Sequence, residues 1–136
     1  MSDYFNTPVL VFACAHAGQA GEISRQLIAG SANPLTTPHA LAECFNSLTY
    51  RLGLPPKDAR RLIAENTKTF SFIALDAADY QAAMDRVVDN GLTGDKIYDA
   101  LHVGAAIKGG AEKIFTSNRR DFVPLQPGIL VEKIAV

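Results

Sequence analysis

The chain has 136 residues, of which 48% are apolar and 20% are charged, so its composition excludes both intrinsic disorder and a fibrous repeat. This length fits one domain. Thirteen basic side chains against fourteen acidic ones give a formal net charge of -1, which excludes a global basic field for nonspecific nucleic-acid binding. No apolar run is long enough to cross a bilayer and residues 1–6 do not resemble a secretion signal, so we expect a cytoplasmic protein without a membrane segment.

Short apolar segments alternate with longer helical patterns along the chain. Strands separated by helices predict a parallel α/β sheet covered by helices on both faces. In such a sheet, ligands bind beyond the carboxyl ends of the strands, so we expect the functional site there. The expected strands are 4–6, a short piece within 33–38, 69–75, 113–116 and 129–134, and the expected helices are 8–13, 21–29, 41–52, 57–68, 77–89 and 96–108.

Three of these helices have apolar residues at helical spacing, which predicts the face that each one turns toward the core. The expected inward residues are Leu41, Phe45, Leu48 and Leu52 in the first, Ala59, Leu62 and Ile63 in the second, and Tyr80, Ala83, Met84, Val87 and Val88 in the third. Asp76 is placed to cap the third helix at its N-terminus.

The cysteines and histidines do not form a recognisable metal or redox motif. Cys14 and Cys44 are not part of a CxxC motif, and we expect both to be core thiols. His16, His39 and His102 are scattered, and we expect them to be surface or helix-packing residues.

Asp99 lies in a helix that is apolar nearly all round. It shares a helical face with Val103 and, one turn earlier, Asp95, and we expect no basic residue on that face to pair with it. A carboxylate withdrawn from water needs a cation, a hydrogen-bond network or a metal ion, and two acids in one patch favour the metal. The alternatives are that Asp95 caps the helix and that Asp99 pairs with a basic residue from elsewhere.

Two further acidic positions are less decisive. Glu43 lies opposite the expected inward face of its helix, which leaves both a solvated glutamate and a site residue open. After the strand at 113–116, the segment 117–122 carries hydroxyl, amide, guanidinium and carboxylate groups, as a phosphate- or metal-binding loop would. Asp121 would otherwise cap a turn.

Four segments in this order resemble the PIN-domain endoribonucleases, and among them the VapC-type toxins of bacterial toxin–antitoxin modules. The resemblance covers nearly all of the chain and implies a single PIN-like domain over 1–136. The implied fold is a three-layer sandwich, with a central, mostly parallel sheet of four or five short strands flanked by helices. The segments are Phe5-Asn6-Thr7-Pro8-Val9-Leu10, Leu41-Ala42-Glu43-Cys44-Phe45, Tyr98-Asp99-Ala100-Leu101-His102 and Thr116-Ser117-Asn118-Arg119-Arg120-Asp121-Phe122.

The resemblance also implies a chemistry: hydrolysis of RNA at a cluster of carboxylates that holds one or two Mg²⁺ or Mn²⁺ ions. These ions prefer oxygen ligands, which suits the residues present. Clustered acids repel one another, so we expect raised pKa values without metal. The implied catalytic residues are Asn6, Glu43, Asp99 and Asp121, with Asn6, Glu43 and Asp99 as metal ligands and Thr7, Asp95, Thr116, Ser117, Asn118 and Arg119 in support.

Position 6 departs from the family pattern, which has an aspartate where this chain has Asn6. An amide keeps an oxygen ligand but loses a full negative charge, so it should weaken metal binding without unfolding the site. We interpret Asn6 as an engineered change that silences a toxic nuclease, with a naturally inactive member as the alternative. An inactive PIN-like domain would serve as a docking module for RNA or protein.

Partners follow from the same resemblance: an RNA substrate, a cognate antitoxin and a second copy of the chain in a homodimer. RNA would meet a local basic rim made by Lys96, Lys108, Arg119 and Arg120. The apolar faces of helices 41–52 and 57–68 would either receive an antitoxin segment or belong to the core.

Overall fold

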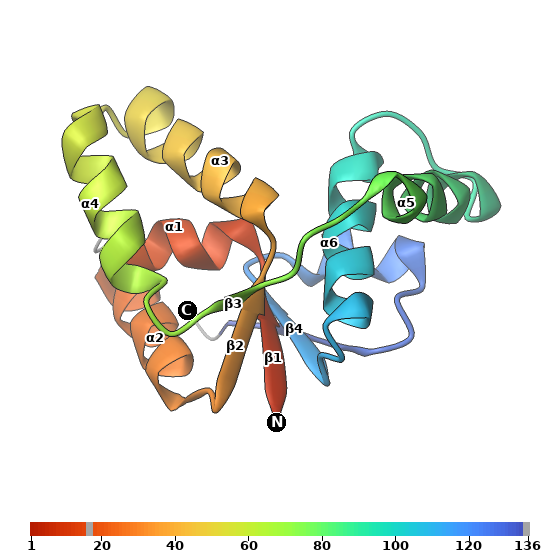
Figure 1. The fold of residues 1–136 in the computed structure, drawn as a ribbon, viewed down its shortest axis with the longest axis horizontal. Helices are drawn as coiled ribbons and strands as arrows, with labels where there is room; N and C mark the ends of the chain where they lie inside the picture. Colours follow the sequence, from red (N-terminus) through yellow and green to blue (C-terminus); the bar gives the residue numbers. More distant parts are fainter. Residues whose placement is uncertain (16–17, 135–136) are drawn as a thin grey trace.

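The computed structural model describes residues 1–15 and 18–134 and contains a five-stranded sheet between two layers of helices, as predicted (Figure 1). Every neighbouring pair of strands is parallel, and the strand order is β3-β2-β1-β4-β5. The order reverses between β1 and β4, and ligands in open parallel sheets bind at such a point. The strands are β1 (Ser2–Phe5), β2 (Asn33–Thr36), β3 (Ser71–Phe72), β4 (Lys113–Thr116) and β5 (Leu130–Lys133).

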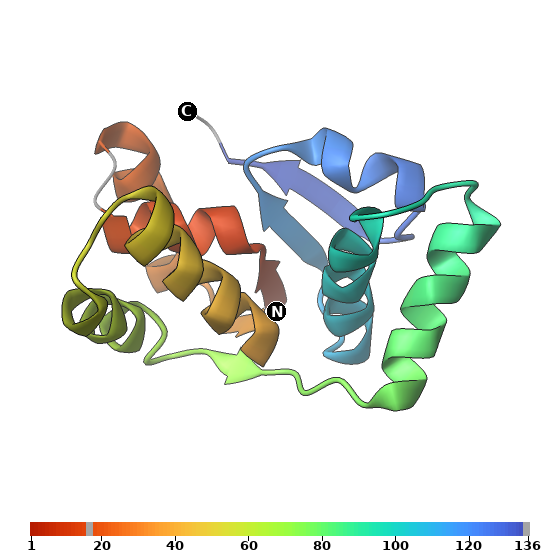
Figure 2. The ribbon, with the colours of Figure 1, turned by 90° about the horizontal axis from the view of Figure 1, so that it is seen from above.

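The two faces of the sheet pack against different helices (Figure 2). Tyr4 and Ile114 pack with residues of α5 and α6, whereas the next residues along the same strands, Phe5 and Phe115, pack with residues of α1 to α4. This alternation follows from the two-residue period of a strand. The helices are α1 (Thr7–Ala15), α2 (Gly18–Gly30), α3 (Pro38–Asn46), α4 (Pro56–Asn66), α5 (Ala77–Asp89) and α6 (Lys96–Lys108).

Local signals explain where the helices begin. Pro8, Pro38 and Pro56 lie in the first turns of α1, α3 and α4, where a missing N–H costs nothing. Asp76 caps α5 as predicted: its side chain accepts a hydrogen bond from the Asp79 amide, and the Asp79 side chain accepts one from the Asp76 amide.

The expected helix over 41–52 is wrong in its second half. The α-helix ends at Asn46, and a π-helical turn over Ser47–Arg51 follows it. The inward row is Ala40, Cys44 and Leu48, whereas Phe45 and Leu52 are exposed. The predicted apolar stripe therefore placed the buried face incorrectly, because Ala40 and Cys44, rather than Leu41 and Phe45, pack in the cluster that contains residues of α1.

The inward face of α5 is also narrower than predicted. Ala83 and Val87 are buried, but Tyr80, Met84 and Val88 are exposed. The strand expected over 69–75 is reduced to Ser71–Phe72 at the edge of the sheet.

The first strand begins and ends earlier than predicted, at Ser2–Phe5 instead of 4–6. Cys14 and Cys44 are buried free thiols, as expected, whereas His16 lies outside the described residues. In the two described stretches, no helix has the length and apolar character needed to span a membrane.

Candidate active site

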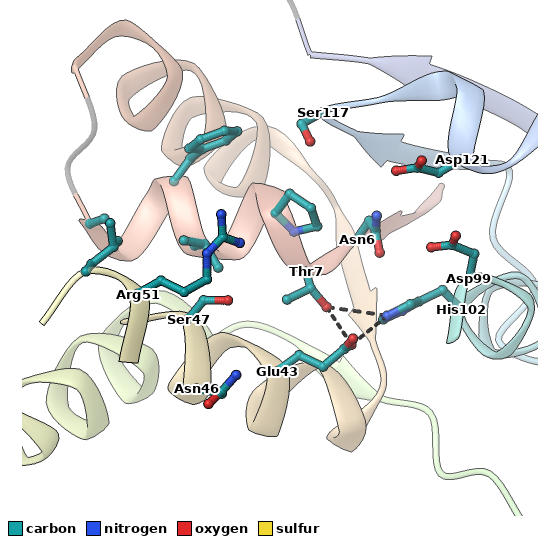
Figure 3. Close-up of a pocket in the computed structure, with 15 residues that line it drawn as sticks. Asn6, Thr7, Glu43, Asn46, Ser47, Arg51, Asp99, His102, Ser117 and Asp121 are labelled. Atoms are coloured by element: carbon teal, nitrogen blue, oxygen red, sulfur yellow. Dashed lines mark hydrogen bonds and ion pairs between the residues drawn. The ribbon is translucent and has the colours of Figure 1, made fainter. Parts of the chain in front are cut away.

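A pocket of about 730 Å³ opens at the carboxyl edge of the sheet, next to the point where the strand order reverses (Figure 3). This is where the sequence predicted the site. The pocket gathers six of the predicted site residues from four separate segments: Asn6, Thr7, Glu43, Asp99, Ser117 and Asp121.

Asn6 and Thr7, which come directly after β1, form the first wall of the pocket. The Asn6 amide N–H donates to the Phe115 carbonyl at 3.0 Å, which continues the pairing of β1 with β4. The Asn6 side-chain Nδ2 donates to Thr116 Oγ1 at 3.3 Å. Thr116 is fully buried and does not line the pocket, whereas Asn6 does. The role of Thr116 is therefore to fix the orientation of the Asn6 side chain.

A buried hydrogen-bond chain holds Glu43 in place. The Tyr4 hydroxyl lies 2.6 Å from His102 Nδ1, and His102 Nε2 lies 2.8 Å from Glu43 Oε1. Thr7 Oγ1 donates to the same Glu43 oxygen at 2.9 Å. Because a carboxylate only accepts, His102 Nε2 carries the hydrogen toward Glu43. Glu43 is therefore a positioned site residue.

The environment of Glu43 lowers its pKa. Burial by itself would raise the pKa of this carboxyl, but hydrogen bonds from His102 and Thr7 and the nearby imidazole outweigh burial. The expectation of raised pKa values throughout the acidic cluster is therefore wrong for Glu43.

Asp99 follows the expectation: burial raises its pKa, and the Asp121 carboxylate raises it further, against the opposing charge of Lys96. The expectation that no basic residue on its own helix would pair with Asp99 is wrong. Lys96, one turn earlier on α6, lies 3.4 Å from Asp99 Oδ2 and 4.0 Å from Asp121 Oδ1. It also donates to the Asp121 carbonyl at 3.1 Å. Lys96 thus forms ion pairs with both acids.

The turn after β4 positions Asp121. The Asn118 amide donates to Thr116 Oγ1, and Asn118 Oδ1 accepts from the Arg120 amide at the start of a 3-10 turn over Arg119–Asp121. Arg119 Nε donates to the Val131 carbonyl on β5. Asn118 and Arg119 therefore hold the loop in shape and lie outside the pocket lining, whereas Ser117 reaches it.

Asp95 and all four residues of the predicted basic rim (Lys96, Lys108, Arg119 and Arg120) lie outside the pocket lining. Asp95 is exposed at the N-cap position of α6, where its side chain makes no capping hydrogen bond. Lys108 lies at the far end of α6 and pairs with Asp79 at 2.6 Å. Position alone on α6 therefore did not separate site residues from surface residues.

Four polar pocket residues were not predicted from the sequence. His102 was expected to be a packing histidine, yet it contacts Glu43 and lines the pocket. Its position three residues after Asp99, on the same helical face, is the signal that could have found it. Arg51 enters the pocket with Asn46 and Ser47 through the π-helical turn, for which the sequence carried no signal.

The donor chemistry of the pocket suits Mg²⁺ or Mn²⁺, because three carboxylates and the amide oxygens of Asn6 and Asn46 line it. Their arrangement is incomplete as a ligand set. Over the described parts of the chain, no three His, Cys, Asp or Glu side chains are grouped closely enough to hold an ion as they stand. Glu43 faces Thr7 and His102, while Asp99 and Asp121 share Lys96.

Known proteins resemble the chain in sequence and in fold. The family model described as PIN domain matches residues 7–123. Ribonuclease VapC40 of Mycobacterium tuberculosis is 34% identical over 86 residues, which are 60% of this chain and 62% of that protein, so the match spans less than two thirds of the relative.

Two solved structures share the fold. One is the VapBC2 complex of Rickettsia felis bound to a promoter DNA fragment, with a TM-score of 0.75, 17% identity, and coverage of 99% of this chain and 100% of that one. The other is the toxin VapC20 of M. tuberculosis, which cleaves the sarcin-ricin loop, with a TM-score of 0.74, 15% identity, and coverage of 89% and 93%. Because the family model spans most of its length, the chain belongs to the PIN-domain family.

Proposed function

We propose that this protein is a metal-dependent endoribonuclease toxin of a type II toxin–antitoxin module, attenuated by Asn6. The observation that carries the proposal is the convergence of Glu43, Asp99 and Asp121 with Asn6 in one pocket at the carboxyl edge of the sheet. Membership of the PIN-domain family and the partial similarity to Ribonuclease VapC40 support the same reading.

Asn6, Glu43 and Asp99 would hold Mg²⁺ or Mn²⁺, with Asp121 beside them. A bound ion would supply a water of lowered pKa and neutralise negative charge on the phosphodiester. The chain's own residues orient the ligands: His102 and Thr7 fix one Glu43 oxygen, and Thr116 fixes the Asn6 amide. Site residues held in this way lose little freedom on binding.

The surroundings of Asn6 are compatible with an aspartate at this position. Thr116 Oγ1 accepts hydrogen bonds from the Asn6 side chain and from the Asn118 amide. Its own hydroxyl hydrogen is therefore available to donate to a carboxylate, so the polar contact at position 6 survives the change. We expect Asn6→Asp to restore a negative charge without loss of the fold.

Cleavage of RNA by the chain and by its Asn6→Asp variant tests this function, with Mg²⁺ or Mn²⁺ present and with an EDTA control. Only the variant should cut efficiently, and EDTA should abolish the cleavage. Asp99→Asn in the Asn6→Asp background should remove activity, whereas Asp95→Asn, which changes an exposed acid of the same helix outside the pocket, should leave it intact.

A folded Asn6→Asp variant that cuts no RNA would contradict the enzymatic proposal. The second candidate, a PIN-like docking module without catalysis, would then gain. Its specific support is the amide at position 6, together with Lys96, whose positive charge already pairs with Asp99 and Asp121.

We also propose a cognate antitoxin and a homodimer as the protein's assemblies. The helical faces first considered for the antitoxin belong largely to the core, because Ala59 and Leu48 are buried and Leu62 and Ile63 pack against the same cluster. The exposed apolar side chains of segment 41–52 are instead Phe45, Tyr50 and Leu52, of which Leu52 lines the pocket. Co-purification of the chain with a co-expressed candidate antitoxin, and sedimentation of the free chain, would test these two assemblies.

A further inference from the structure

The pocket has a positive group facing its acids. Arg51 lines the pocket together with Asn46 and Ser47, and Figure 3 shows this group on one side and Asp99 and Asp121 on the other. Among the described residues, Arg51 forms no ion pair and no side-chain hydrogen bond, in contrast to Lys96, Lys108 and Arg119. Its guanidinium donors are thus available to a ligand.

The π-helical turn explains why Arg51 reaches the pocket. The inward row of α3 advances by four residues, from Ala40 to Cys44 to Leu48, and regular helical spacing would continue this row at residues 51 and 52. Instead, the Leu52 amide bonds to the Ser47 carbonyl, five residues back, so the turn contains an extra residue. Arg51 and Leu52 are thereby rotated away from the core and line the pocket. Such π-turns occur frequently at functional sites.

The charges of the pocket fit a phosphodiester chain better than a single small anion. The acidic side would attract a phosphate only through a cation, whereas Arg51 can bind one directly by a bidentate hydrogen bond. An RNA strand carries phosphates at regular intervals, so one strand would satisfy both sides at once. Asn46 and Ser47 add neutral polar groups beside the guanidinium.

We infer that Arg51 binds a backbone phosphate of single-stranded RNA next to the phosphate at the acidic cluster, and so fixes the register of the strand in the pocket. This inference rests on the proposed RNA-cleaving function. It assigns Arg51 a binding role, distinct from that of the groups at the reacting phosphate.

Binding of a fluorescent single-stranded oligoribonucleotide to the chain, titrated at several salt concentrations with Mg²⁺ present, tests this role. Arg51→Ala should weaken binding by about tenfold and reduce the slope of log Kd against log salt by about 0.7, the value for one phosphate contact on a single strand. Arg51→Lys should keep most of the salt slope, because it keeps the charge. Arg60→Ala is the matched control, since Arg60 is an exposed arginine of α4 outside the pocket lining.

A second measurement ties the effect to one phosphate. Neutral methylphosphonate linkages are placed at each position of the oligonucleotide in turn. At one position the neutral linkage and Arg51→Ala should each weaken binding, and together they should cost no more than either alone. In the Asn6→Asp background, Arg51→Ala should raise KM with little change in kcat, as expected for a group that binds substrate and transition state equally.

The inference is overturned if Arg51→Ala binds RNA as Arg60→Ala does, or if its effect adds to that of every neutral linkage, while the Asn6→Asp variant still cuts RNA. In that case the nuclease proposal stands without Arg51. If neither the chain nor its Asn6→Asp variant binds or cuts RNA, the proposed function itself fails and the inference fails with it.

Discussion

Replacement of His102 by phenylalanine should destabilise the protein well beyond the effect of an ordinary surface change. The imidazole is 2% exposed and connects the Tyr4 hydroxyl to the Glu43 carboxylate. Phenylalanine keeps a ring in this space but offers neither nitrogen. The fully buried Tyr4 hydroxyl then loses its hydrogen bond to His102, which costs about 1–3 kcal/mol. Glu43 loses one donor but keeps Thr7 and partial contact with water, which adds about 1 kcal/mol.

Urea unfolding at neutral pH measures this loss, which we expect to total about 2–4 kcal/mol. A double-mutant cycle with Tyr4→Phe isolates the hydrogen bond: once the tyrosine hydroxyl is gone, His102→Phe should cost about 1 kcal/mol less than it does alone. The control is His39→Phe, the same substitution at a partly exposed histidine stacked on Tyr98, and its effect should stay within about 0.5 kcal/mol. A loss below about 1 kcal/mol for His102→Phe, or strictly additive effects with Tyr4→Phe, would refute the reasoning.

Acid titration provides a second readout of the same network. Because the folded-state pKa of Glu43 is lowered, its ionised form contributes stability that is present above the ordinary value of 4.5 and is lost as the pH falls through the lowered folded-state pKa. The stability difference between His102→Phe and the unaltered chain should therefore be largest near neutral pH and shrink below pH 4.5. A difference that grows in acid would contradict this assignment.

Three further predictions follow from the structure. Asp99→Asn should raise the free energy of unfolding at neutral pH, because burial and Asp121 raise the pKa of the Asp99 carboxyl. This gain in stability should disappear as the pH falls toward 3.8 and below. A variant that is less stable in urea titrations at neutral pH would contradict this prediction. Gly109→Ala should lower the thermal midpoint, at a cost of about 1–3 kcal/mol, because a Cβ there would lie 2.9 Å from side chains of β2 and of the segment after β3. Gly104→Ala, in open space within α6, is the control and should not destabilise the protein. Equal midpoints for the two variants would refute the steric argument. Cys14 and Cys44 should react slowly with a thiol reagent under native conditions, since each is 1% exposed, and prompt labelling of the folded chain would show that the core opens readily.

Strand positions were predictable because short apolar runs bounded by turn residues leave few alternatives. The positions of Asn6 and Ser117 followed from them, since residues after β1 and β4 must meet at one edge of a parallel sheet. Asp99 was detectable as a carboxylate in an apolar helix. In these cases the signal lies within a few residues of the position concerned.

Long-range contacts and local irregularities were not predictable in the same way. Glu43 is defined as a site residue by His102, which is 59 positions away, and its own helix pattern does not reveal that partner. The π-helical turn shifts Arg51 and Leu52 by one residue, which no apolar spacing encodes. On α5, Tyr80, Met84 and Val88 have the spacing of a buried stripe but are exposed, so hydrophobicity alone placed them incorrectly.

The place of β1 at the centre of the sheet affects when the site comes into existence during synthesis. β1 leaves the ribosome long before β4, its neighbour across the switch point, and Asp99 and Asp121 emerge after β1, β2 and α1 to α5. A nascent chain that ends before β4 contains Asn6, Glu43 and Asp99, but it lacks Ser117 and Asp121 and the strand that pairs with β1 at the switch point. The acidic pocket is therefore complete only after β4 and the turn that follows it have been made, so shorter nascent chains carry no assembled pocket.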